Sequence, residues 1–203
     1  MNNKDIIKKE IDILIKNKTI NPIIYNQGNI VFNEGDNCQY LGYLIKGKIT
    51  ISTLSFNDKE EIISNINEGD FFGQFLLFND ENNKYLGDVI STKKSLVALI
   101  NKELLNEIMM KNKTFLNAYL SIISEEAYKI KQQVKLFSHK KNVDRIIYYL
   151  KNNTIDNKID IKSVSALAKV LNLPRENVSR IINKLIKDGY ITKENNIITC
   201  KKN

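Results

Sequence analysis

The sequence is poor in the residues on which most catalytic and metal chemistry depends. Its 203 residues include one histidine, two cysteines, two prolines and no tryptophan. A single histidine, His139, provides neither a histidine-rich metal site nor the redundancy expected around a Ser-His-Asp triad. Cys38 and Cys200 lie far apart in the sequence and form no CxxC motif, which is typical of a reduced compartment. We therefore expect a protein that is not an enzyme and has no cofactor and no metal.

Long apolar runs are also missing. No stretch of eighteen apolar residues occurs, and the first residues, MNNKDIIKKEIDILIK, alternate charge with isoleucine where a signal peptide would be apolar. Hydrophobic residues make up 42% and charged residues 27%, as in ordinary globular proteins. The sequence thus predicts a folded cytoplasmic protein without a membrane partner.

The positive charge is confined to one end of the chain. Residues 1–137 contain 17 Lys+Arg and 17 Asp+Glu, whereas residues 138–203 contain 14 Lys+Arg and 6 Asp+Glu. The whole net charge of +8 therefore lies in the last 66 residues. Because this segment also carries patterned Ile, Leu and Val, it should fold, and a folded basic segment favours binding to a polyanion.

Glycine divides the remaining chain. Seven of the eight glycines fall between residues 21 and 99, among short Ile, Val, Tyr and Phe runs, which predicts an antiparallel roll or barrel. Within it, GYLIKGKITIS predicts a strand pair folded at Gly47, and EEIISNINEGD predicts a strand ending in a Gly-Asp turn. An amphipathic helix over about residues 2–18 precedes the roll.

Residues 101–137 are predicted to be helical, and their second part carries a heptad seam. The seam consists of Leu116, Leu120, Ile123, Ala127, Ile130 and Val134, followed by Phe137. Phe115, Tyr119 and Ile122 form a second apolar stripe beside it. Both stripes could pack within one chain. We favour a homodimer seam, because the chain offers no second helix of matching length.

The last 66 residues predict two short helices joined by a tight turn. Ser163 is a plausible N-cap for a helix over residues 164–171, and Asn172 can adopt the left-handed conformation of a tight turn. Pro174 suits the first turn of a helix over residues 174–187, which Gly189 ends. A small hairpin around residues 191–198 follows. This is the pattern of a helix-turn-helix with a wing.

The outward face of the second helix suits the reading of DNA. Arginine can bond guanine at two acceptors and glutamate can accept from cytosine, when a helix lies in the major groove. The alternative is that these charged residues form an ordinary solvated surface of the helix. The basic residues around it and the predicted wing favour DNA binding over this alternative. The predicted DNA-contacting residues are Arg175, Glu176, Ser179, Arg180, Lys184 and Ser163.

Over nearly its whole length the chain resembles the Crp/Fnr family of bacterial transcription regulators. FNEGDNCQYLGYLIKGKITI and INEGDFFGQFLLF resemble the family's double-stranded β-helix, and SVSALAKVLNLPRENVSRIINKLIKDGYI resembles its winged helix-turn-helix. The resemblance implies that Arg175, Glu176 and Arg180 hold base-reading positions and that the heptad helix dimerises. Pro174 replaces a frequent Ser or Thr, so one phosphate contact is missing. Double-stranded DNA, a second copy and RNA polymerase are the partners implied.

The resemblance also bears on an effector. Cyclic-AMP-binding members carry Gly-Glu and then Arg-Ser or Arg-Thr, whose Arg forks onto the cyclic phosphate. At the corresponding pocket positions this chain has Gly73, Gln74, Lys84 and Tyr85. Lysine lacks the forked geometry and Tyr85 adds bulk, so we expect no cyclic nucleotide. Residues 1–30 contain no cysteine for an iron–sulfur centre, and Cys38 is expected to be a packed hydrophobe. The effector is an unknown small molecule or absent.

The predicted fold class is α+β. It comprises an N-terminal antiparallel, jelly-roll-like β-helix (1–100), helices that include the dimerisation helix (101–137), and a C-terminal winged helix-turn-helix (138–203). A small-molecule-binding module whose C-terminal domain contacts proteins is the alternative function. A metal-dependent enzyme on the same roll is disfavoured, because the roll has no histidine.

Overall fold

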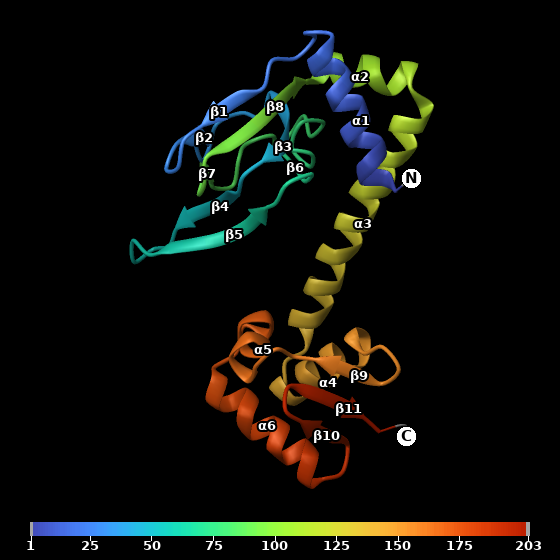
Figure 1. The fold of residues 1–203 in the computed structure, drawn as a ribbon. Helices are drawn as coiled ribbons and strands as arrows, with labels where there is room; N and C mark the ends of the chain where they lie inside the picture. Colours follow the sequence, from blue (N-terminus) through green and yellow to red (C-terminus); the bar gives the residue numbers. More distant parts are fainter. Residues whose placement is uncertain (1, 202–203) are drawn as a thin grey trace. The chain divides into compact units, whose positions relative to one another are not determined.

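The computed structural model describes residues 2–201. Their contacts divide into two compact units within one helix, α3, after Glu125. The N-terminal unit contains the following elements (Figure 1): α1 (Asn3–Lys16), β1 (Ile23–Tyr25), β2 (Ile30–Phe32), β3 (Tyr40–Lys46), β4 (Ile49–Leu54), β5 (Glu60–Ile66), β6 (Phe71–Phe72), β7 (Asp88–Ser91), β8 (Ser95–Asn101), α2 (Lys102–Lys111) and the first half of α3 (Lys113–Ser138). Among the described residues, no helix combines the length and the apolar character that crossing a membrane requires.

The eight strands form the predicted antiparallel roll from two four-stranded sheets. One sheet has the order β1-β8-β3-β6 and the other β2-β7-β4-β5. The predicted strand pair folded at Gly47 is wrong in its pairing, because β3 pairs with β8 and β6 while β4 pairs with β5 and β7. The chain therefore passes from one sheet to the other at Gly47, whose φ of +107° suits glycine. The predicted Gly-Asp turn follows β5, with Gly69 at φ +85°.

Helix α1 packs its apolar stripe into the core of the roll. Ile7 and Ile11 are almost completely buried. A capping box between Asn2 and Asp5 fixes the start of the helix. Two side-chain hydrogen bonds, of 2.8 Å each, hold α1 against the rest of the unit. Asn112 Nδ2, between α2 and α3, donates to Glu10 Oε2, and Asn3 Nδ2 donates to Ser121 Oγ of α3.

The two apolar stripes of α3 have different surroundings. The stripe that contains Phe115, Tyr119 and Ile122 is buried in the core of the roll. Along the heptad seam, Leu116 is half-buried, Ile123 packs partly against that core and Ala127 is exposed. Leu120, Ile130 and Val134 have exposed fractions of 52%, 49% and 65%. One stripe thus packs within the chain, and the dimeric role of the other stays a prediction.

The C-terminal unit is a small helical domain with a three-stranded sheet. Besides the end of α3 it contains α4 (Asn142–Asn153), β9 (Lys158–Asp160), α5 (Val164–Leu171), α6 (Arg175–Lys187), β10 (Ile191–Glu194) and β11 (Ile197–Cys200). The strands follow the antiparallel order β10-β11-β9. Leu136, near the end of α3, is buried in this unit's core. Contacts of the C-terminal unit therefore begin within the segment 101–137, which was predicted to contain the helices that include the dimerisation helix.

Candidate nucleic-acid interface

The turn between α5 and α6 has the geometry that its sequence predicts. Ser163 caps α5, because its Oγ accepts a hydrogen bond of 3.0 Å from the Ala166 N–H. Asn172 ends α5 in the left-handed conformation, with φ 50° and ψ 51°. Pro174 takes the N-cap position of α6, so the helix begins at Arg175, one residue later than expected. Three local signals in the sequence thus position the second helix.

A shared apolar core fixes which face of α6 points outward. The buried side chains that join the two helices are Leu167, Ala168, Leu171, Val178, Ile181, Ile182 and Leu185. Ala168 is the small residue at this contact, as predicted. Because these positions occupy one side of α6, its polar side chains are left on the other.

The outward face of α6 brings together five of the six residues predicted to contact DNA. Arg175, Glu176, Arg180 and Lys184 are exposed, and Ser179 is half-buried among them. Neither arginine nor Lys184 has an ion-pair partner in the described part of the chain. The three cations are therefore available to an external anion. The sixth predicted residue, Ser163, lies at the start of α5, where its Oγ is engaged in the cap.

One positioning residue, Arg145 of α4, has no clear signal in the sequence. Its guanidinium donates to the Leu171 carbonyl at the end of α5 (3.4 Å) and to the His139 carbonyl (3.2 Å). It also lies 5.5 Å from the ring centre of Phe137. Arg145 thus connects the end of α3, α4 and the helix-turn-helix. A charged residue within an amphipathic helix is normally assigned to its solvent face, which is why the pattern conceals this role.

The four predicted effector-pocket residues differ in their exposure. Tyr85 is 3% exposed and stacks on Phe32, with ring centres 4.7 Å apart. Gly73, at φ +80°, lies against it, since a Cβ there would be 3.3 Å from the Tyr85 hydroxyl. Gln74 is half-buried nearby in sequence, and Lys84 is exposed.

The surroundings of Tyr85 are apolar and packed. Phe32 also contacts the Phe72 ring, with centres 6.3 Å apart. Burial and, to a smaller extent, the Cys38 thiol raise the pKa of the Tyr85 phenol above its ordinary value. Burial likewise raises the pKa of Cys38, which keeps it a thiol. Tyr85 therefore packs in an aromatic cluster with Phe32 and Phe72, whereas Lys84 is exposed.

Comparison with known proteins agrees with both halves of the fold. Residues 22–112 match the model of the cyclic nucleotide-binding domain, and residues 162–192 match that of the winged helix-turn-helix DNA-binding family. The cAMP-activated global transcriptional regulator Vfr of Pseudomonas aeruginosa is 39% identical over 57 residues, which are 28% of this chain and 27% of that protein. The sequence match thus spans about a quarter of that curated relative.

Solved structures share the fold over nearly the whole chain. The catabolite activator protein of Thermus thermophilus has a TM-score of 0.56 at 17% identity, covering 95% of this chain and 90% of that one. The c-di-GMP responsive global regulator CLP of Xanthomonas campestris has a TM-score of 0.52 at 20% identity, covering 91% and 95%. The chain thus joins a match to the cyclic nucleotide-binding domain with a match to the winged helix-turn-helix, and it shares its fold with these solved regulators.

Proposed function

We propose that the protein is a homodimeric, sequence-specific DNA-binding regulator of transcription. The observation that carries this proposal is the outward face of α6, where Glu176 and three cations that have no ion-pair partner among residues 2–201 lie on one short helix. That helix lies in the last 66 residues, the part of the sequence that holds the entire net charge of +8. Long-range attraction to phosphate and short-range contact with base edges are thus supplied by the same unit.

Different residues serve these two purposes. Arg175 and Arg180 have the forked guanidinium that recognises the O6 and N7 acceptors of guanine, and Glu176 can accept a hydrogen bond from the cytosine amino group. Lys184 lies one turn beyond Arg180 and offers a single point charge, which suits a phosphate. Ser163 can contribute a phosphate contact from the start of α5. We therefore assign sequence reading to the first turns of α6 and positioning to its later part.

Dimerisation is proposed to pair the exposed seam of α3 with the same seam of a second copy. Ile130 and Val134 are about half or more exposed in the single chain, although their residue types favour burial. A two-fold dimer presents two copies of α6 to one face of DNA, about 34 Å apart, and so reads a near-palindrome. RNA polymerase is the further partner that such a regulator would contact in the cytoplasm, where its DNA target lies.

Control by cyclic AMP is not part of this proposal. The ring of Tyr85 packs against Phe32 beside Gly73, and Lys84 lacks the fork that holds a cyclic phosphate. Within residues 2–201 no three His, Cys, Asp or Glu side chains are grouped as a metal site would require. We propose no enzymatic activity for the chain, and an effector other than a cyclic nucleotide or none.

Recovery of genomic fragments on the purified protein tests the function. We expect enrichment of sites that share a near-palindromic motif, and binding to one of them that weakens steeply with salt, by about 0.9 log units of affinity per log unit of salt for each phosphate contact. Fragments without a shared motif, bound as well as any other duplex, would contradict sequence reading. Retention of protein partners but no DNA would favour the alternative of a protein-contacting module.

A further inference from the structure

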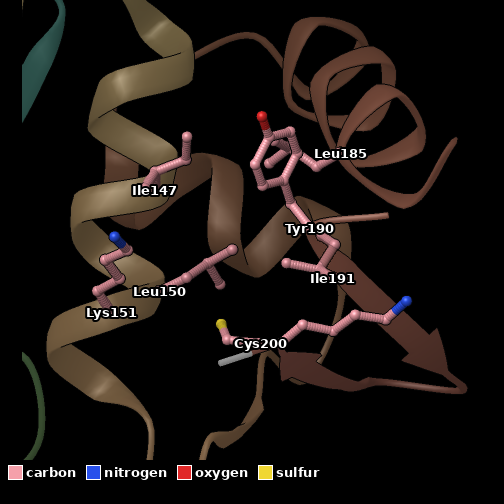
Figure 2. Close-up of a pocket in the computed structure, with 8 residues that line it drawn as sticks. Ile147, Leu150, Lys151, Leu185, Tyr190, Ile191 and Cys200 are labelled. Atoms are coloured by element: carbon pink, nitrogen blue, oxygen red, sulfur yellow. The ribbon is translucent and has the colours of Figure 1, made fainter. Parts of the chain in front are cut away.

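The C-terminal unit contains a cleft that the DNA-reading face does not use. It has a volume of about 270 Å³ and lies between α4, the end of α6 and the β10–β11 hairpin (Figure 2). Ile147 and Leu150 of α4, Leu185 of α6 and Ile191 of β10 supply its apolar wall. The volume is just below the range of about 300–1,000 Å³ found for ligand pockets, so only a small molecule fits.

The charged side chains that line this cleft are both cationic. Lys151 and Lys201 contribute to the lining, together with Tyr190 and Cys200, and none of the described residues that line the cleft is acidic. Figure 2 shows the ring of Tyr190 on one side of the cleft and the sulfur of Cys200 directed toward Leu150. Burial raises the pKa of the Cys200 thiol, and the nearby Lys151 ammonium opposes this rise. The Lys151 charge is therefore felt at the thiol within the cleft.

We propose that this cleft binds a small carboxylic acid with an apolar body, either a short acyl chain or a single ring. The body would contact Ile147, Leu150 and Ile191, where it replaces water on apolar surface. The carboxylate would pair with the Lys151 ammonium at the rim. A neutral molecule of the same shape would gain the apolar contact but not the ion pair with Lys151. We therefore expect the cleft to bind the carboxylic acid more tightly than the neutral molecule.

Such a ligand would touch both parts of the DNA-binding module. Backbone hydrogen bonds connect the end of α6 to the hairpin through one residue, since the Tyr190 N–H donates to the Leu185 carbonyl (2.9 Å) and the Lys201 N–H donates to the Tyr190 carbonyl (3.1 Å). A molecule bound at this connection contacts both α6 and the wing. If it binds one arrangement of α6 and the wing more tightly than another, it shifts the population toward that arrangement and so changes the affinity for the operator. This regulatory consequence rests on the proposed function, whereas binding to the cleft does not.

Alkylation of Cys200 provides a direct test on the full-length protein. The rate of its reaction with iodoacetamide is measured by mass spectrometry with and without octanoate, and Cys38, which is 4% exposed in the other unit, is the internal control. We expect saturating octanoate to slow alkylation of Cys200 by fivefold or more and to leave Cys38 unchanged. Octanol should need a higher concentration for the same protection, by up to about fivefold, the largest ratio expected from an exposed ion pair.

Two lysine variants separate the cleft from general charge effects. Lys151→Gln should remove the advantage of octanoate over octanol, whereas Lys140→Gln, an exposed lysine outside the cleft, should keep it. Rates are compared with and without ligand in each variant, because Lys151 also affects the thiol itself.

Absence of protection, confirmed by calorimetry with no octanoate binding, would overturn the site. Equal protection by octanol, or an unchanged preference in Lys151→Gln, would overturn the ligand class. Protection without any change in operator affinity would leave the site and reject only its regulatory role.

Discussion

Replacement of Ile130 by glutamate is expected to convert the dimer into a monomer. Ile130 lies on the exposed stripe of α3, between Leu120 and Val134, and is 49% exposed in the single chain. Complete burial of such a side chain contributes about 1.5–3 kcal/mol. Since about half of that is already realised within the chain, burial at the seam would contribute about 1 kcal/mol in each copy, or about 2 kcal/mol for the pair.

The glutamate adds a second penalty. Two carboxylates would have to be buried beside apolar neighbours without partners, and each costs at least the roughly 1–3 kcal/mol of an uncharged polar group buried without a partner. The total loss of at least about 4 kcal/mol corresponds to a dissociation constant about a thousandfold higher. Because Ile130 is not part of the core of either unit, the monomer should keep its fold.

Sedimentation velocity at micromolar concentration measures this change. Gln132→Glu is the matched control, because it places the same charge two residues away on the same helix, about 200° around its axis. We expect a monomer for Ile130→Glu, a dimer for the control, and unchanged far-ultraviolet circular dichroism for both. A dimer of wild-type strength in Ile130→Glu would refute the assignment of this stripe.

Three further predictions concern the two units separately. Gly42→Ala should lower the stability of the roll by about 1–3 kcal/mol, because its Cβ would lie 2.1 Å from the Phe72 ring, and Phe72→Leu should partly restore the melting temperature. Arg145→Leu should destabilise the C-terminal unit by about 1–3 kcal/mol, read as a melting point several degrees lower, since two carbonyls lose their donor. Calorimetry with cyclic AMP should show no saturable binding at micromolar concentration, and a micromolar affinity lost in Lys84→Ala would contradict our account of the pocket.

The helix-turn-helix could be predicted almost to the residue because its signals are local. Ser163 at the N-cap, Asn172 in the left-handed conformation and Gly189 after the last turn each act within a few positions of the chain. The apolar spacing then determines which face of α6 is buried, so the exposed arginines follow from the same pattern. Pro174 was misplaced by one position, which is the usual uncertainty of a helix start.

Features that depend on distant parts of the chain could not be predicted in the same way. A strand followed by glycine and a second strand is typical of a hairpin, yet β3 and β4 do not pair with each other: β3 pairs with β6 and β8, and β4 pairs with β5 and β7. The same limit applies to Arg145, whose acceptors are carbonyl groups up to 26 residues away. The cleft beside Cys200 likewise requires α4, α6 and the wing to be assembled, and no local pattern indicates it.

The most direct test of the central claim compares three variants of α6 on one operator and on a scrambled duplex by fluorescence anisotropy at fixed salt. Arg175→Ala and Arg180→Ala should each cost about 1–3 kcal/mol on the operator and little on the scrambled duplex, because base contacts carry the sequence information. Lys184→Ala should weaken both duplexes by a similar factor. If both arginine variants keep the wild-type ratio of operator to scrambled affinity, α6 does not read the sequence and the account is wrong.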